Sequence, residues 1–120
     1  MALKFESVVV DCADPQRVAA FWAALLERPL AGPDGEGGYW IDPSDVSPEL
    51  IFGTVPEGKT VKNRLHIDLR PDNQEAEVAR ALSLGAQHVD IGQADVTWVV
   101  LADPEGNEFC ILRSRQPADN

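Results

Sequence analysis

The chain has 120 residues, of which 44% are hydrophobic, and it carries a formal net charge of −10 at pH 7. This length predicts one domain with a shared core, and the acidic balance argues against nucleic-acid and membrane-surface partners, because like charges repel. The sequence contains no apolar run of membrane-spanning length, and its first residues lack the features of a signal peptide. We therefore expect a cytoplasmic protein.

The first half of the sequence begins with a predicted strand and a predicted helix. Residues 5–12 are apolar and rich in β-branched side chains, as strands are. Asp14 and Pro15 then predict a helix start, because an N-cap side chain is followed by a proline in the first turn. The helix is expected to end before Pro29. Its apolar face, at helical spacing, comprises Val18, Phe21, Trp22 and Leu25.

Further strands are predicted after this helix, at residues 39–41 and 49–55. Residues 31–38 are rich in glycine and proline and predict irregular structure, which would take the place of part of a strand. Residues 56–62 then connect the two halves. The first half is therefore interpreted as a strand, a helix and about three strands.

The second half follows the same order. Alternating apolar and polar residues over 64–70 predict a half-buried strand. Asp72 with Glu75 resembles a capping box for a second helix, and Gly85 is suited to end that helix. Residues 103–107 predict a tight turn before the last strand. The remaining strands are expected at 87–91, 97–101 and 108–112.

The two halves resemble each other in sequence as well as in order. Residues 7–10 correspond to residues 66–69, and residues 49–52 correspond to residues 108–111. Two copies of one small unit can bury their apolar faces together. Equivalent positions of the two copies are therefore expected to meet at a shared cleft.

The two-residue period of the strands assigns side chains to two faces of each predicted sheet. The face expected under the helices comprises Val8, Val10, Leu65, Ile67, Leu69, Phe109 and Ile111. The opposite face comprises Ser7, Val9, Asp11, His66, Asp68, Arg70, Glu108 and Cys110. The polar groups gathered on this second face predict a ligand cleft, and the alternative is a face that is merely solvated.

Three segments of the chain, residues 8–26, 63–69 and 98–109, resemble the vicinal-oxygen-chelate superfamily. This superfamily includes glyoxalases, bleomycin-resistance proteins and extradiol dioxygenases. The resemblance implies an α+β fold with two tandem βαβββ modules, at about residues 1–58 and 59–120. Their curved mixed sheets would enclose a cleft, formed within one chain or across a homodimer.

The resemblance also implies where metal ligands would lie. Metal-dependent members use four side chains, usually His or Glu, and the equivalent positions here are Ser7, Ile51, His66 and Cys110. His66 alone is a usual family ligand, and Ile51 has no donor atom. Further acidic groups on the same face, which would give a different geometry, are Asp11, Asp68 and Glu108. We therefore expect a degenerate metal site, with no bound metal and no other cofactor.

His66 is the candidate catalytic residue, because an imidazole titrates near neutral pH and can donate or accept a proton. Asp68 and Glu108 would orient it; alternatively, His66 only forms a hydrogen bond across the sheet. Cys110 has no evident cation to lower its pKa, which argues against a nucleophile. The predicted ligand-binding set, with two tryptophans as apolar walls, is Ser7, Asp11, Trp40, Ile51, His66, Asp68, Trp98, Glu108 and Cys110.

Three functions are compatible with these features. The first is a metal-independent binder of a small molecule, similar to the bleomycin-resistance proteins that sequester a drug in dimeric clefts. The second is a lyase, isomerase or dioxygenase-type enzyme that uses His66 as acid/base or as ligand of an unorthodox metal site. The third is a scaffold with a vestigial cleft. The expected partners are a small-molecule ligand and a second copy of the chain in a homodimer.

Overall fold

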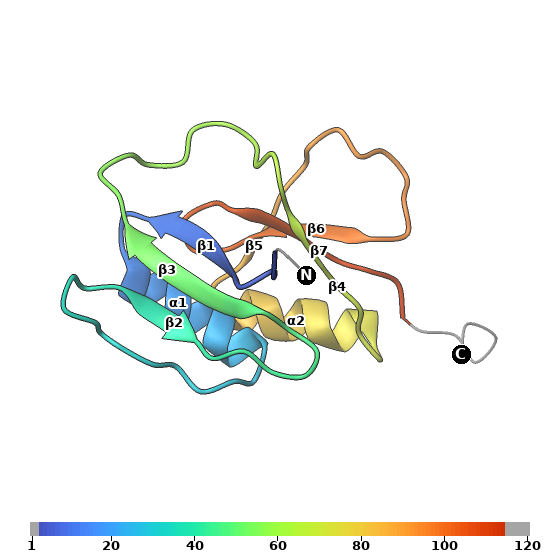
Figure 1. Cartoon of the computed structure of the whole chain (residues 1–120). Helices are drawn as coiled ribbons and strands as arrows, with labels where there is room; N and C mark the ends of the chain where they lie inside the picture. Colours follow the sequence, from blue (N-terminus) through green and yellow to red (C-terminus); the bar gives the residue numbers. More distant parts are fainter. Residues whose placement is uncertain (1–2, 115–120) are drawn as a thin grey trace. The chain divides into compact units, whose positions relative to one another are not determined.

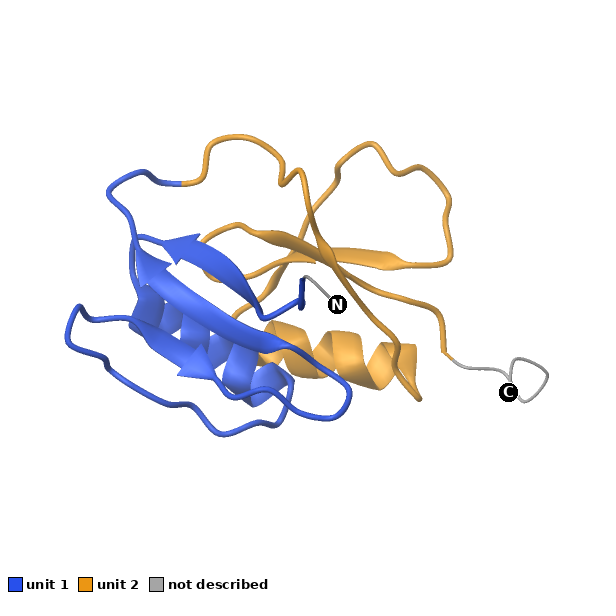
Figure 2. Cartoon of the chain, viewed as in Figure 1, with its two compact units in different colours: residues 1–58 blue, residues 59–120 orange. Residues whose placement is uncertain are grey.

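The computed structural model describes residues 3–114 and shows an α+β fold with two helices and two mixed sheets, as predicted (Figure 1). The chain divides into two compact units, Met1–Gly58 and Lys59–Asn120 (Figure 2). That the two units form one domain around a common cleft remains a prediction. Within the described residues, no helix is long and apolar enough to cross a membrane.

The first unit contains β1 (Ser7–Cys12), α1 (Pro15–Leu25), β2 (Tyr39–Ile41) and β3 (Glu49–Thr54). Its three strands are ordered β1-β3-β2, with β1 parallel and β2 antiparallel to the central β3. Helix α1 packs on this sheet. The predicted strands and helix of this half are therefore confirmed, apart from shifts at their ends.

Helix α1 begins as its sequence predicts. The Asp14 side chain accepts a hydrogen bond from the backbone N–H of Arg17 at 3.3 Å, and Pro15 occupies the first turn. The predicted apolar face is buried, and the rings of Phe21 and Trp22 meet edge to face with centroids 5.5 Å apart. Each such side chain stabilises the fold by about 1.5–3 kcal/mol on burial. The side chains of the sheet that belong to this core include Ile41, Leu50 and Phe52.

The first unit has two strands after its helix rather than about three. Ala31 forms an isolated bridge with Trp40 where another strand would run. The glycine-rich segment then turns back around Asp34, whose carboxylate accepts hydrogen bonds from the backbone N–H groups of Glu36 and Gly38 at 2.8 and 2.9 Å. These bonds lower the pKa of Asp34. In this segment the Asp34 carboxylate accepts the backbone hydrogen bonds that a neighbouring strand would otherwise accept.

The second unit contains β4 (Ile67–Leu69), α2 (Gln74–Leu84), β5 (Gln87–His88), β6 (Val99–Ala102) and β7 (Glu108–Ile111). Its strands are ordered β4-β7-β6-β5, with β4 parallel to β7 and the other pairs antiparallel. This unit has the full strand–helix–three-strand order predicted for each half.

The predicted start of α2 is wrong by one residue. Asn73, and not Asp72, is the N-cap, and its side chain accepts a hydrogen bond from the backbone N–H of Ala76 at 3.0 Å. The next N–H, of Gln74, donates to the Ser114 hydroxyl at 2.8 Å, so a contact from outside the helix helps to fix the register. Gly85 ends the helix with φ = 118°, as predicted, because this left-handed conformation suits glycine.

Strands β4 and β5 are much shorter than predicted, whereas β6 and β7 differ from their predicted ranges by one or two residues at their ends. Strand β4 covers three residues of the predicted 64–70, and Leu65, expected under the helix, is 89% exposed. The backbone N–H of Asn63 bonds to the side chain of Glu108 at 2.9 Å, so the chain just before β4 is tied by a side chain and not by a strand ladder. Strand β5 covers two residues of the predicted 87–91.

The turn between β6 and β7 has the predicted form. The buried Asp103 carboxylate accepts hydrogen bonds from the backbone N–H groups of Glu105 and Asn107, at 2.9 and 3.0 Å. Gly106 adopts φ = 90°, which glycine tolerates without strain. This turn sets β7 against β6 and thereby positions the side chains described next.

Candidate functional site

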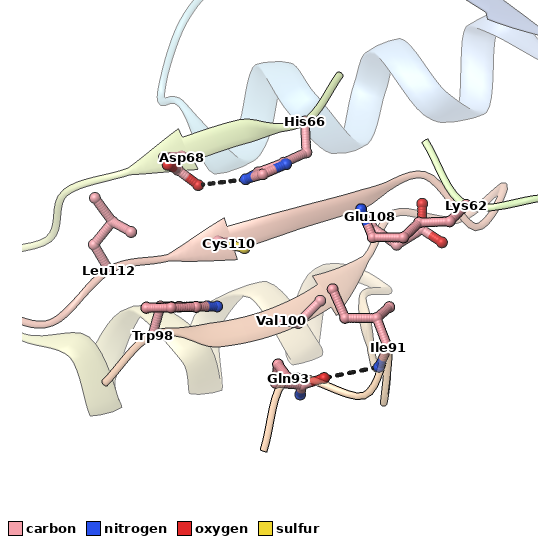
Figure 3. Close-up of a pocket in the computed structure, with 10 residues that line it drawn as sticks. All are labelled: Lys62, His66, Asp68, Ile91, Gln93, Trp98, Val100, Glu108, Cys110 and Leu112. Atoms are coloured by element: carbon pink, nitrogen blue, oxygen red, sulfur yellow. Dashed lines mark hydrogen bonds and ion pairs between the residues drawn. The ribbon is translucent and has the colours of Figure 1, made fainter. Parts of the chain in front are cut away.

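A cavity of about 370 Å³ lies on one face of the second unit's sheet (Figure 3). Its walls combine ionisable and apolar side chains from β4, β6 and β7, from the loops before β4 and β6, and from the residue after β7. The lining residues are Lys62, His66, Asp68, Ile91, Gln93, Trp98, Val100, Glu108, Cys110 and Leu112.

Strand register explains why these side chains share a face. Asp68 pairs with Cys110 across β4 and β7, and Cys110 pairs with Val100 across β7 and β6. Side chains two residues apart on a strand point to the same side. His66, which immediately precedes β4, and Glu108, at the start of β7, are therefore brought to the same face (Figure 3).

His66, Asp68 and Cys110 form a compact cluster. The His66 Nε2 and Asp68 Oδ1 atoms are 3.0 Å apart, and one donor atom from each of the three residues lies within 4.8 Å of the others. His66 and Asp68 are nearly half exposed, whereas Cys110 is 5% exposed. Burial raises the pKa of the Cys110 thiol, and the Asp68 carboxylate raises it further. The thiol is therefore poorly suited to act as a nucleophile at neutral pH.

The sequence suggested that Glu108 would orient His66. In the structure, the Glu108 carboxylate instead binds Lys59 and the backbone of Asn63. Lys59 Nζ lies 3.0 Å from Glu108 Oε1, and the Asn63 backbone N–H donates to the same oxygen at 2.9 Å. Burial alone would raise the pKa of Glu108, but the hydrogen bonds from Asn63 and Lys59 and the lysine charge outweigh burial and lower the pKa. Sequence reasoning missed the roles of Lys59 and Asn63, because their common partner, Glu108, is more than 40 residues away along the chain.

The apolar wall of the cavity is formed by Trp98 with Ile91, Val100 and Leu112. Trp98 is 40% exposed, so part of its indole surface is open to a ligand. Gln74 of α2 donates through Nε2 to the Thr97 carbonyl at 2.9 Å and thereby holds the chain just before Trp98. The sequence indicated Trp98 but not Ile91, which lay in the predicted strand 87–91, nor Gln93 and Lys62, which lie in irregular segments.

Comparison with known families decides the classification. Residues 7–112 match the family described as the glyoxalase-like domain. This chain is a member of that family. The resemblance to the vicinal-oxygen-chelate superfamily is thereby confirmed. A comparison with curated proteins finds no match.

Solved structures show the same fold for this glyoxalase-like domain. A glyoxalase/bleomycin resistance protein/dioxygenase family enzyme from Burkholderia phytofirmans PsJN is 18% identical, with a TM-score of 0.69 over 92% of this chain and 98% of that chain. TnmS3, an antibiotic binding protein from Streptomyces sp. CB03234, is 19% identical, with a TM-score of 0.64 over 96% and 99%. The fosfomycin resistance protein FosX from Listeria monocytogenes, complexed with Mn(II), is 11% identical, with a TM-score of 0.71 over 99% and 96%.

The predicted site residues in the first unit of this glyoxalase-like domain lie on one face of its sheet. Ile51 of β3 pairs with Val9 and Trp40 on its two sides, and alternation places Ser7 and Asp11 on the face of Val9. The Trp40 indole N–H donates to the Asp42 carboxylate at 3.1 Å. That these residues join those of the second unit in one binding site remains a prediction.

The four family metal positions do not fit a metal in this glyoxalase-like domain. Ile51 offers no donor atom, and Ser7 is a poor donor while its hydroxyl is protonated. His66 and Cys110, both in the second unit, retain donors. Two ligands alone do not hold a metal ion tightly, so the family's two-module ligand set is incomplete in this chain.

Proposed function

We propose that the cavity of the second unit binds a small organic molecule that combines a flat apolar part with a polar or cationic group. The observation that carries this proposal is the pairing of an apolar wall with the Asp68 carboxylate in a cavity of about 370 Å³. Ligand pockets of roughly 300–1,000 Å³ commonly have such walls with a few polar groups. Sequestration of a drug or metabolite is the function that this arrangement supports best.

The exposed Asp68 carboxylate favours a cationic group on the part of the ligand that lies beside it. Asp68 is 49% exposed and faces the cavity, so an incoming cation can reach it. Glu108 is paired with Lys59 and contributes little net charge, while Lys62 adds one positive charge to the lining. The Asp68 and Lys62 charges cancel over the whole lining, so the preference for a cation is local: the cationic group of the ligand is expected beside Asp68, and its apolar part on Trp98.

The relatives support binding as the function without naming a ligand for this chain. One structural neighbour is an antibiotic binding protein, and another is a fosfomycin resistance protein. A cytoplasmic homodimer with a small-molecule partner, and with no nucleic-acid or membrane partner, is the setting we propose. Light scattering on the purified protein tests the dimer, and a monomer at micromolar concentration would contradict it.

A thermal-shift screen with cationic aromatic antibiotics tests the binding proposal, because a ligand that binds the folded state raises the melting temperature. For a compound that stabilises the wild type, Trp98→Ala should weaken binding at least about tenfold, through loss of aromatic contact area. Asp68→Asn should weaken the binding of a cationic compound more than the binding of a neutral analogue. Asp45→Asn, at an exposed site outside the cavity, is the matched control. Unchanged binding by Trp98→Ala and Asp68→Asn would refute the proposal.

The alternative function is acid/base catalysis by His66 on a small carbonyl compound. It is favoured by the 3.0 Å contact between His66 and Asp68, because a carboxylate that orients a histidine also sets which ring nitrogen carries the proton. His66→Ala would then abolish turnover of a candidate substrate while leaving its binding measurable. Equal turnover by His66→Ala and by the wild type would exclude this alternative.

A further inference from the structure

The cluster of His66, Asp68 and Cys110 differs from the family's metal positions because it lies within a single unit. All three residues belong to the second unit, and two of them are direct cross-strand partners on β4 and β7. Asp68 is not one of the four family positions. A donor set of this kind is therefore complete without any residue of the first unit.

We propose that this cluster is a zinc site, with His66, Asp68 and Cys110 as its three protein ligands. The site would lie wholly within the second unit and would replace the four-ligand set that the first unit can no longer complete. The inference goes beyond the proposed ligand binding, and because it assigns Asp68 to the metal, pairing of Asp68 with an organic cation is expected in the metal-free protein alone.

The donor chemistry suits zinc. Imidazole nitrogen, thiolate sulfur and carboxylate oxygen are its usual ligands, and three protein ligands are typical of sites that keep one position open. A thiolate and a carboxylate with a neutral imidazole would balance the two positive charges of the ion. This balance reduces the cost of placing a divalent ion beside the buried Cys110.

The distances require little rearrangement. In tetrahedral zinc sites, bonds of about 2.0–2.3 Å place neighbouring donor atoms roughly 3.3–3.6 Å apart. The His66 and Asp68 donors are already 3.0 Å apart, and no pair in the cluster exceeds 4.8 Å. Rotation of the half-exposed His66 and Asp68 side chains toward Cys110 can close the remaining gap.

The fourth position would face the cavity. Glu108 also lines the cavity, but its carboxylate is held by Lys59 and Asn63 and is not free to move to the metal. Trp98 and Val100 offer no strong donor. Water or a donor atom of a bound ligand would therefore fill the fourth position.

Cobalt substitution gives a direct test on the full-length protein. Co²⁺ bound to a thiolate gives a near-ultraviolet charge-transfer band, so the metal-stripped wild type should show this band and should bind about one equivalent of Zn²⁺ in competition with a chromogenic chelator. Cys110→Ser should abolish the band. His66→Ala and Asp68→Asn, at exposed positions that tolerate substitution, should each lower zinc affinity at least about tenfold.

The chain supplies its own controls, because it contains two cysteines and two histidines. Cys12 is buried in the first unit and His88 is exposed on β5, so Cys12→Ser and His88→Ala should retain the band and the zinc affinity. Absence of the band in the wild type would overturn the proposal. A band that survives in Cys110→Ser, or that disappears equally in His88→Ala, would also overturn it. Thermal shifts by organic ligands on metal-free protein report the binding function separately.

Discussion

The two units share one plan but distribute burial differently. Seven of the eleven residues of α1 are buried, whereas Ala81 is the buried residue of α2. Strands β1 and β3 have six residues each, whereas β4 has three. The second unit nevertheless contains the described cavity and the His66, Asp68 and Cys110 cluster. In this duplicated fold, one copy has the more extensive core and the other has the candidate site.

Sequence composition accounts for this difference. Helix α1 contains large aromatic side chains on its inner face, whereas the corresponding face of α2 has Val78, Ala81 and Leu82, of which Leu82 is 36% exposed. Large apolar side chains provide most of the burial energy of a small domain. Substitutions on the two helices are therefore expected to give the largest difference in the free energy of unfolding.

The largest expected effect comes from replacing one large apolar side chain on each helix by alanine. Trp22→Ala should lower the free energy of unfolding by about 3–5 kcal/mol, because it leaves a cavity in the core of the first unit. Leu82→Ala on α2 should cost about 1 kcal/mol or less, as is usual for a partly exposed position. Urea denaturation followed by circular dichroism measures both. Equal losses would show that the two helices contribute alike to stability.

The next effect concerns the ion pair at the edge of the cavity. Glu108→Gln should cost about 1.5–3 kcal/mol at neutral pH, because Lys59 and Asn63 lose a charged acceptor that is 10% exposed. The pKa of Glu108 in the folded protein is lowered from its ordinary value of 4.5, so this stabilisation is present above that value and is lost as the pH falls through the lowered pKa.

The pH dependence provides the control for this ion pair. The stability difference between the wild type and Glu108→Gln, measured by urea denaturation at several pH values, should shrink as the solution becomes acidic. Glu57→Gln, at an exposed residue of the connector, should show no comparable difference. If this stability difference stays constant over the pH values at which carboxyl groups titrate, the Glu108 charge does not have the assigned role.

The smallest effect distinguishes the two candidate caps of α2. Asn73→Ala should lower the free energy of unfolding by about 1 kcal/mol, because the backbone N–H of Ala76 loses its acceptor. Asp72→Ala, at the residue that the sequence pattern indicated, should cost much less. Denaturant midpoints of the two variants measure the difference. A larger loss for Asp72→Ala would restore the capping box as the correct interpretation.

The sequence predicted features that depend on neighbouring residues. Asp14 with Pro15 marked the start of α1, Gly85 marked the end of α2, and the Asp103 turn was correctly placed. Each of these features is set by backbone conformation and by hydrogen bonds within a few residues. Local sequence therefore contained enough information to place them.

The sequence did not predict features that depend on distant partners. Strand β4 begins where its pairing with β7 begins, at Ile67, so Leu65 lies outside the strand although it fits the alternation pattern. The engagement of Glu108 by Lys59 joins residues that no pattern relates. Within the candidate site, the cluster around Asp68 was accessible from strand alternation, but the loop residue Gln93 was not.

The parallel pairing of β4 with β7 has a consequence for the growing chain. Asp68 and Cys110 are partners across these strands, and the whole of α2, β5 and β6 is synthesised between them. A nascent chain that has not yet reached β7 contains His66 and Asp68 but lacks both the partner strand of β4 and the thiol. Because chains emerge from the ribosome N-terminus first, the candidate site belongs to the finished polypeptide, whereas the first unit has all of its strands before residue 59 is added.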